Sequence, residues 1–219
     1  MGFAALTSGG KDSILSVQKA IDKGIEITHL VTVRPENPDS FMFHSSNLDA
    51  VPVIAGLSGI GYTEIHTKGE KENELQDLSD GLRKLEIEGI TVGAVNSVYQ
   101  NERVHTIADN IGIEVFAPLW QMDPEQLLRE VADRMDAILV VTAADGLNED
   151  LLGRHIDYDL IEQLRDISGR HHIHLAGEGG EYESLTMNAP FFQRPLRYSS
   201  ARVIRHGAGR NELLLGGFS

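Results

Sequence analysis

Six residues near the amino terminus, Ser8-Gly9-Gly10-Lys11-Asp12-Ser13, lie between a short apolar run and an amphipathic stretch. The run Phe3–Thr7 has the composition of a strand, and Lys11–Lys23 carries apolar residues on one helical stripe before Gly24. A glycine turn between a strand and a helix brings backbone N–H groups together at the positive end of the helix dipole. The six residues therefore predict a cradle for phosphate groups.

The side chains of this loop suit a nucleotide bound with a metal ion. Its two glycines let the backbone approach phosphate oxygens, Lys11 supplies a positive charge, and Ser8 and Ser13 offer hydroxyl donors. Asp12 would repel a bare phosphate, but it fits if Mg²⁺ bridges its carboxylate to the phosphates. The loop is not a Walker A loop, because Ala5 and Asp12 stand where that motif has glycine and Ser or Thr.

The first half of the chain alternates strand and helix patterns. The strand patterns are Phe3–Thr7, Ile25–Val33, Tyr62–His66, Ile90–Val95 and Glu114–Phe116. The helix patterns are Lys11–Lys23, Glu70–Glu88 ended by Gly89, and Arg103–Asn110 ended by Gly112. This alternation predicts an α/β fold with a parallel sheet covered by helices on both faces. We expect residues 34–46 to form a loop at a strand carboxyl end, where ligands of such sheets bind.

The alternation weakens near Pro118, so we expect a nucleotide-binding domain over residues 1–118 and a smaller α+β domain over residues 119–219. In the second domain the pattern predicts helices at Pro124–Met135, capped by Asp123, and at Tyr158–Ile167. Strand patterns follow at Ala137–Thr142, His172–Leu175, Ala201–Arg205 and Glu212–Leu215.

Composition excludes several classes of protein. The chain has no cysteine, which excludes disulfides, thiolate zinc sites and a cysteine nucleophile. A net charge of −14 argues against stable nucleic-acid binding. No apolar run is long enough for a membrane helix, and the start does not resemble a signal peptide, so we expect a cytoplasmic protein without membrane contact. The sequence leaves the oligomeric state open, a homo-oligomer included.

A second unusual stretch, Gly177-Glu178-Gly179-Gly180-Glu181-Tyr182-Glu183-Ser184, carries three carboxylates and three glycines. Its composition has poor helix and strand propensity, so a purely structural role is hard to explain. Glycines allow a ligand to approach closely, and carboxylates bind a cation, a metal or a proton. The stretch is therefore a candidate for the second part of a site.

The loop Ser8–Ser13 resembles the signature of the N-type ATP pyrophosphatases, or PP-loop enzymes, and the whole chain resembles the diphthine–ammonia ligase family. The residues that carry the second resemblance are Ser8–Ser13, Phe41-Met-Phe-His44, Ser97-Val-Tyr-Gln-Asn-Glu-Arg103, Pro118-Leu-Trp120, Leu152-Gly-Arg154 and Gly177–Ser184. In this family the last motif usually ends in threonine, so Ser184 is a departure that keeps the hydroxyl. The resemblance implies a nucleotide-binding domain of the adenine-nucleotide α-hydrolase (HUP) type, and the chain looks like a compact, archaeal-type member.

The resemblance also implies a reaction. ATP would adenylate the carboxylate of diphthine, a modified histidine of translation elongation factor 2, with release of pyrophosphate. Ammonium would supply the nitrogen that displaces AMP and forms the amide of diphthamide. Two alternatives stay open: a PP-loop enzyme that adenylates or amidates a small molecule, and a nucleotide-binding module without turnover.

Roles for individual residues follow from the loop and the resemblance together. Ser8, Gly9, Gly10, Lys11, Asp12 and Ser13 would bind ATP, with Lys11 and Asp12 taking part in catalysis and Asp12 holding Mg²⁺. Glu181 or Glu183 would be the base that the attacking nitrogen requires, so that replacing Glu181 by glutamine abolishes amide formation. The expected substrate-binding residues are His44, Ser97, Tyr99, Gln100, Arg103, Glu178, Gly179 and Gly180.

Overall fold

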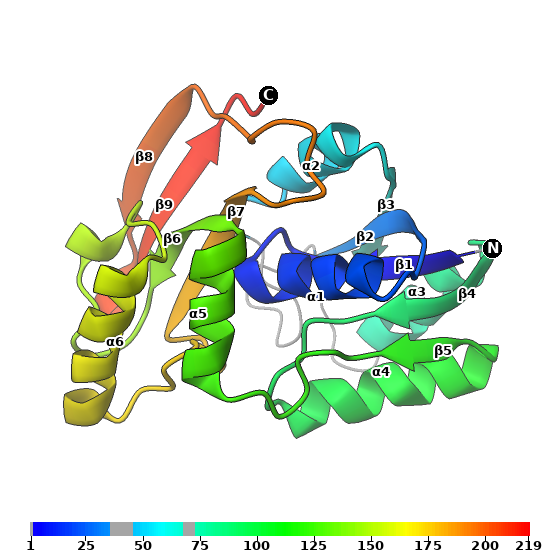
Figure 1. Cartoon of the computed structure of the whole chain (residues 1–219), viewed down its shortest axis with the longest axis horizontal. Helices are drawn as coiled ribbons and strands as arrows, with labels where there is room; N and C mark the ends of the chain where they lie inside the picture. The colour runs from blue at the N-terminus through cyan, green and yellow to red at the C-terminus, as the bar shows by residue number, and fades with distance from the viewer. Residues whose placement is uncertain (1, 36–45, 68–72) are drawn as a thin grey trace.

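The computed structural model describes residues 2–35, 46–67 and 73–219, and within these ranges the chain forms two sheets (Figure 1). The first sheet is parallel, with the strand order β3-β2-β1-β4-β5. Its strands are β1 (Gly2–Leu6), β2 (Ile27–Pro35), β3 (Gly61–Thr67), β4 (Ile87–Thr91) and β5 (Glu114–Phe116). The helices between them are α1 (Lys11–Asp22), α2 (Ala50–Ser58), α3 (Asn73–Leu82) and α4 (Val98–Ile111). The predicted parallel α/β fold is confirmed.

The helices cover both faces of this sheet because its strands are apolar on both sides. On one face Ile14 and Ile54, from α1 and α2, pack in the same core as Leu30 of β2. On the other face Leu78 of α3 and Ile107 of α4 share a second core with strand residues. Burial on both faces is typical of parallel sheets built from crossover units.

The strand order reverses between β1 and β4, because the chain moves outward to β2 and β3 and then returns to the other side of β1. In such sheets, the crevice outside the carboxyl ends of the two strands at the reversal is where ligands bind. The segment Ser8–Ser13 leaves the carboxyl end of β1, and residues 92–94 leave that of β4. The fold therefore places the predicted phosphate loop at its ligand-binding crevice.

The second sheet is antiparallel, with the order β7-β6-β9-β8. Its strands are β6 (Asp136–Thr142), β7 (Tyr182–Asn188), β8 (Ser200–Arg205) and β9 (Asn211–Gly216). Its helices are α5 (Pro124–Arg134) and α6 (Tyr158–His171), with short 3₁₀ turns η1 (Glu149–Leu151) and η2 (Gly207–Gly209). Asp123 caps α5 as predicted, since its side chain accepts a hydrogen bond from the Gln126 N–H at 2.9 Å. A smaller α+β unit is confirmed.

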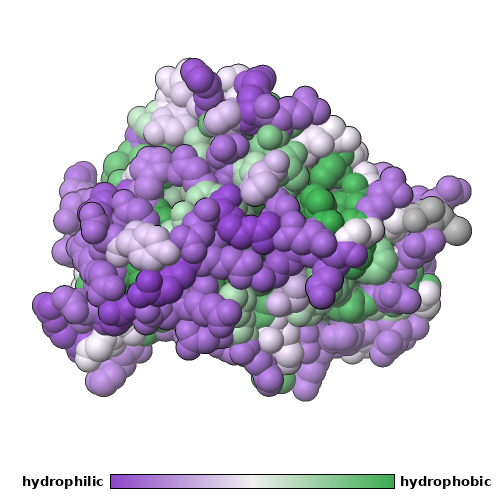
Figure 2. Space-filling view, in the orientation of Figure 1, coloured by the Kyte–Doolittle hydropathy of each residue, from purple (hydrophilic) through white to green (hydrophobic). Residues whose placement is uncertain are grey.

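One core joins the two sheets on the side where α1 lies. The cluster that holds Ile14 and Leu15 of α1 also contains Leu127 of α5, Leu139 of β6 and Leu185 of β7. Figure 2 shows that hydrophilic residues cover most of the outer surface over α1, α5 and α6. Helix α1 packs against both sheets, and its amino-terminal end lies beside the second sheet (Figure 1). No helix within the described residues is long and apolar enough to cross a membrane.

Two predicted boundaries in the first half are wrong. Helix α3 ends at Leu82, and Gly89, expected to end that helix, lies within β4. There a side chain would collide with the Phe3 ring, since a Cβ would lie 2.4 Å from it, so Gly89 allows two strands to pack closely. Residues 34 and 35 belong to β2 and not to a loop, whereas residues 36–45 fall outside the described part of the chain.

In the second half the predicted strand His172–Leu175 is absent from the described structure. His172 has a positive φ of 54° and ends α6, and the following residues form a loop. Two elements were not predicted from the sequence. These are α2, which is apolar on nearly all sides, and β7, which begins inside the acidic stretch at Tyr182. Helix α4 also begins at Val98, earlier than the predicted Arg103.

Candidate active site

The loop after β1 has the backbone geometry that a phosphate cradle requires. Gly9 has a φ of 81°, in the left-handed region that favours glycine. The loop is held by its own polar groups, since the Gly9 N–H donates to Thr7 Oγ1 at 2.9 Å and Ser13 Oγ donates to the Gly10 carbonyl at 3.0 Å. Helix α1 begins directly after Gly10, so its first-turn N–H groups, which have no carbonyl partner within the helix, lie at the same crevice.

The loop is hydrogen-bonded to the second sheet. The Thr186 N–H of β7 donates to the Gly9 carbonyl at 2.9 Å, and the Lys11 N–H donates to Ser184 Oγ at 3.1 Å. A Cβ on Gly10 would lie 3.2 Å from the Ser184 carbonyl, so this approach leaves little room for a side chain. The two unusual stretches of sequence, 173 positions apart at Lys11 and Ser184, are therefore in direct contact.

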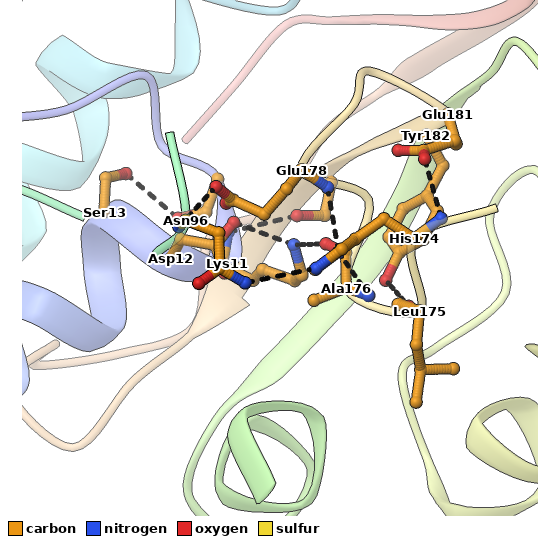
Figure 3. Close-up of polar contacts among 12 residues, drawn as sticks. Lys11, Asp12, Ser13, Asn96, His174, Leu175, Ala176, Glu178, Glu181 and Tyr182 are labelled. Carbon is orange, nitrogen blue, oxygen red and sulfur yellow. Dashed lines mark hydrogen bonds and ion pairs between the residues drawn. The ribbon is translucent and has the colours of Figure 1, made fainter. Parts of the chain in front are cut away.

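Lys11 is almost fully buried at this junction (Figure 3). Its Nζ donates to the Ala176 carbonyl at 2.7 Å and pairs with Asp12 Oδ2 at 2.8 Å. It also lies 5.2 Å from the centre of the Tyr182 ring, within the range of a cation–π contact. A buried ammonium with these partners is a fixed positive charge between the loop and the acidic stretch.

A single pocket has walls from both stretches. The loop contributes Ser8, Gly10, Lys11, Asp12 and Ser13, and the acidic stretch contributes Gly177, Glu178, Tyr182, Glu183 and Ser184. Most of the remaining lining is apolar, namely Leu6, Val31, Val33, Leu48, Val92, Ala94 and Val104, and it is completed by Thr7, Ser46, Gly93 and Gln100. The pocket thus has a polar, charged end beside α1 and an apolar wall along the carboxyl ends of β1, β2 and β4.

Glu178 lines this pocket and contacts the segment that follows β4. Its Oε2 accepts a hydrogen bond from the Asn96 N–H at 3.1 Å (Figure 3). Burial raises the pKa of Glu178, and the nearby Asp12 carboxylate raises it further, whereas the Asn96 N–H and Lys11 oppose the shift. A carboxylate with a raised pKa inside a pocket is a suitable proton acceptor.

Glu181 has a different position, outside the pocket lining. Its Oε1 accepts from the His174 N–H at 2.7 Å, and its Oε2 accepts from the Gly179 N–H at 2.8 Å. The loop that it holds contains two glycines with positive φ, Gly177 at 76° and Gly180 at 81°. Both carboxylate oxygens are thus engaged with backbone groups, and the side chain fixes the shape of the loop that carries Glu178.

Glu183 and Tyr182 complete the acidic side of the pocket. Glu183 Oε1 accepts from Arg210 Nη2 at 3.2 Å, so its charge is paired with a guanidinium at the start of β9. Tyr182 is buried and donates from its hydroxyl to the Leu175 carbonyl at 2.8 Å. Burial raises the pKa of Tyr182 well above its usual range, and Asp12 adds to the effect, so the phenol stays neutral.

Of the residues expected to bind substrate after β4, Gln100 lines the pocket. Ser97 caps α4 by accepting from the Gln100 N–H at 3.3 Å, and the Arg103 guanidinium lies 3.9 Å from the Tyr99 ring centre. His44 and the neighbouring residues Phe41–Phe43 lie outside the described residues. The expected residues that do not line this pocket within the described ranges are Gly9, Ser97, Tyr99, Arg103, Gly179, Gly180 and Glu181.

Comparisons with known proteins identify the family of the chain. Residues 1–115 match the family described as diphthamide synthase N-terminal domain, and residues 123–211 match the diphthamide synthase C-terminal domain. The chain belongs to the diphthamide synthase family.

Several curated relatives and one solved structure are similar to this chain. The human diphthine–ammonia ligase is 34% identical over 95% of this chain and 86% of its own length. The mouse diphthine–ammonia ligase is 32% identical, with the same coverage of 95% and 86%. A solved structure described as a predicted subunit of tRNA methyltransferase from Methanocaldococcus jannaschii is 16% identical, with a TM-score of 0.47 over 87% of this chain and 98% of that chain.

The pocket of this diphthamide synthase family member offers one oxygen suited to Mg²⁺. Asp12 Oδ1 is buried and has no hydrogen-bond partner within the described residues, whereas its other oxygen pairs with Lys11. Mg²⁺ is commonly held by one or two carboxylates together with substrate phosphates. The Asp12 carboxylate, which lines the pocket within the phosphate loop, fits that chemistry.

Three residues of this site were not singled out from the sequence. Asn96 holds Glu178, Arg210 pairs with Glu183, and Gly93 packs against the first turn of α1, where a Cβ would lie 2.6 Å from the Ser13 nitrogen. Asn96 and Gly93 follow a strand at the sheet reversal, which is a signal that sequence reasoning can use. Arg210 lies far along the chain, and only the folded structure brings it to the pocket.

Proposed function

We propose that this protein is an ATP-dependent ligase that converts the diphthine carboxylate of translation elongation factor 2 into the amide of diphthamide, using ammonium as nitrogen donor. The observation that carries the proposal is the pocket with walls from both Ser8–Ser13 and Gly177–Ser184. The curated relatives named diphthine–ammonia ligase supply the substrate class. We also propose that residues 1–118 bind ATP, that residues 119–219 bind the protein substrate, and that the enzyme works in the cytoplasm.

The two ends of the pocket suit the two ends of ATP. The phosphates would lie against the loop, where first-turn N–H groups and the buried Lys11 charge favour anions. The base would lie against the apolar wall formed by residues such as Val31, Val92 and Val104. Asp12 would hold Mg²⁺, which neutralises charge on the pyrophosphate when bound.

The reaction needs two successive displacements, the first at the α-phosphorus of ATP and the second at the acyl carbon. A diphthine carboxylate oxygen attacks the α-phosphorus of ATP, and the bond to the departing pyrophosphate breaks, which leaves an acyl-adenylate. Ammonia then attacks the acyl carbon, and the bond to the AMP oxygen breaks as the amide forms. Lys11 and the loop amides would stabilise the leaving pyrophosphate, because they are fixed before the charge develops.

We propose Glu178 as the group that takes the proton from the attacking nitrogen. It lines the same pocket as Asp12, and burial raises its pKa, which strengthens the carboxylate as a proton acceptor. Glu183 would serve the positive end of diphthine, since it lines the same pocket and already pairs with a cation, Arg210. Glu181 would act by holding the loop.

Incubation with ATP, Mg²⁺ and ammonium tests the proposal, with AMP and amide formation as readouts. AMP that appears only with diphthine-bearing elongation factor 2 supports the ligase, and a Lys11→Met variant serves as the inactive control. AMP formed with a small metabolite instead would favour another PP-loop enzyme. ATP that is bound but never cleaved, with any of these substrates, would favour a nucleotide-binding module and contradict the proposal.

A further inference from the structure

One segment of this acidic chain is basic. Residues 184–211 contain five arginines and no aspartate or glutamate, whereas the whole chain has 19 Lys and Arg against 33 Asp and Glu. This segment runs along β7 to β8 and turns into β9. Half of the ten arginines in residues 119–219 therefore lie in this one segment, where no carboxylate side chain offsets them.

Two of these arginines already have acidic partners and three do not. Arg205 pairs with Glu149, and Arg210 pairs with Glu183. The other three are Arg194, Arg197 and Arg202, which are exposed and have no ion pair within the described ranges 2–35, 46–67 and 73–219. Exposed arginines without partners are available to bind an acidic surface.

Two of these arginines, Arg197 and Arg202, border the free edge of a sheet. Strand β8 is the last strand of the order β7-β6-β9-β8, and its recorded pairing among the described residues is with β9 (Figure 1). The hairpin extends further, because the Arg197 N–H and carbonyl bond to Ser219 at 3.0 Å each. In an antiparallel pair every second residue turns its N–H and C=O away from its partner strand, so the outer side of β8 presents backbone groups that can accept another strand.

The same edge exposes apolar side chains. Tyr198 and Val203 are each 42% exposed, and Leu214 of β9 is 37% exposed, beside Arg202 in the register. Arginine and tyrosine at a sheet edge are typical of surfaces that bind other proteins. We define the β8 edge as Arg197, Tyr198, Arg202 and Val203.

The β8 edge leads to the candidate active site. Its carboxyl end turns through η2 into Arg210, whose guanidinium binds Glu183 in the pocket wall. Beside it, Asn211 Nδ2 donates to Thr142 Oγ1 of β6 at 3.3 Å. A segment bound along β8 would thus run toward the pocket, and as an extended strand it would span about 3.3 Å per residue.

We propose that the β8 edge is the docking surface for an acidic, extended segment of the protein substrate, which adds a strand beside β8. This inference rests on the proposed function, because the β8 edge would bind the protein substrate whose modified side chain must reach the pocket. Backbone pairing supplies binding that does not depend on sequence, and the arginines select an acidic segment.

Two other occupants fit the observations less well. A second copy pairing through the same edge would bring its own Arg197 and Arg202 against these arginines, and like charges directly opposite destabilise a sheet. Nucleic acid would have to approach a chain with a net charge of −14, and firm binding uses about 6–10 phosphate contacts, more than three free arginines provide. An acidic protein segment needs only this local patch.

The test compares two variants with equal charge change. In the edge variant, Arg197→Glu and Arg202→Glu reverse the β8 edge. In the control, Lys23→Glu and Lys84→Glu reverse two exposed lysines of the first unit for which no ion pair is recorded in the described residues. Both are assayed for AMP formation with diphthine-bearing elongation factor 2, and circular dichroism with thermal unfolding checks that each is folded.

We expect the edge variant to raise KM for the elongation factor by about 10-fold or more, from two lost attractions and two added repulsions, with kcat unchanged. The control should change KM less than about 2-fold, within the small effect of isolated surface charges. A milder pair, Arg197→Gln with Arg202→Gln, should give an intermediate rise, and higher salt should shrink the difference between wild type and variants.

Three results would overturn the docking. The first is an edge variant that is folded and has unchanged KM and kcat for the elongation factor. This result would leave the proposed function intact. The second is wild-type binding of a 20-nucleotide RNA, seen by fluorescence anisotropy, that the edge variant loses while KM stays the same. The third is a wild-type dimer in sedimentation that the edge variant splits, again with KM unchanged. A wild-type enzyme that forms no AMP with the elongation factor would instead overturn the proposed function and this inference with it.

Discussion

Replacing Glu181 by glutamine tests whether this residue holds its loop in place or accepts a proton in the reaction. The Glu181 carboxylate accepts backbone N–H groups of His174 at 2.7 Å and Gly179 at 2.8 Å, and it does not line the pocket. Glutamine keeps one acceptor oxygen and turns an NH₂ group toward the other N–H. The variant therefore loses one hydrogen bond to a charged group and weakens the second.

The size of this loss sets a limit on the fall in activity. A hydrogen bond to a charged group contributes roughly 1.5–3 kcal/mol, and water at this partly exposed loop replaces some of it. A net loss of about 1.5–2 kcal/mol lowers the population of the ordered loop by about 10- to 30-fold at most. Removing a general base would instead cost about 10²–10⁴-fold.

The assay is steady-state AMP release with diphthine-bearing elongation factor 2 across a pH series. For Glu181→Gln we expect kcat/KM to fall no more than about 30-fold, with the shape of the pH profile retained. Glu178→Gln, the matched change in the same loop, should lose more than about 10²-fold and flatten the acid side of the profile. A Glu181→Gln variant that loses more than this limit and flattens the profile, while hydrogen exchange shows an ordered loop, would refute the assignment.

Three further predictions concern the phosphate loop and its surroundings. Asp12→Asn should raise the Mg²⁺ concentration for half-maximal AMP formation by about 10-fold or more, and an unchanged requirement would exclude Asp12 as a ligand. Gly9→Ala should destabilise the fold by about 1–2 kcal/mol in urea unfolding, because φ is 81° and Leu185 lies 3.2 Å from the new Cβ. Gly56→Ala in α2, where a Cβ meets no atom within 4 Å, should instead stabilise it by about 0.5–1 kcal/mol. Burial raises the pKa of Glu178 above its usual 4.5, so the folded state holds the proton more tightly and stability should fall as pH rises above that value. Glu178→Gln should reduce that fall, and an equal pH dependence in both proteins would contradict the assigned shift.

The sequence predicted those elements whose pattern is local and complete. Strand β1, the phosphate loop and α1 are contiguous, and each has its own signal, so their prediction is confirmed at the level of fold. Helix α2 was missed because Ala50–Ser58 is apolar on nearly every side and gives no amphipathic period. The predicted helix Glu70–Glu88 ran too far because Leu85 continues its spacing, although Ile87 pairs in the sheet with Gly2.

The candidate site was predictable only in part, because its second half depends on contacts between distant segments. The acidic stretch was recognised by composition, but the sequence did not show which of its carboxylates would line the pocket and which would bind its own loop. Tyr182 begins a strand there, so Glu181 and Glu183 on either side of it have different surroundings. One carboxylate binds its own loop and the other lines the pocket beside Arg210. No spacing in the sequence separates these two residues, since the difference arises from where β7 starts.

The position of Ser184 explains why the second motif needs a hydroxyl at its end. The N–H of Lys11 is one of the first-turn donors of α1 that no helix carbonyl can satisfy, and it donates to Ser184 Oγ at 3.1 Å. Serine and threonine both supply that acceptor, so the departure from threonine costs nothing at this bond. Together with the Thr186 N–H bond to the Gly9 carbonyl, it fixes the distance between the phosphate loop and the acidic stretch. In the proposed reaction the carboxylates would therefore keep a set position relative to a nucleotide bound at the loop, which both the attack on the α-phosphorus and the later attack on the acyl carbon require.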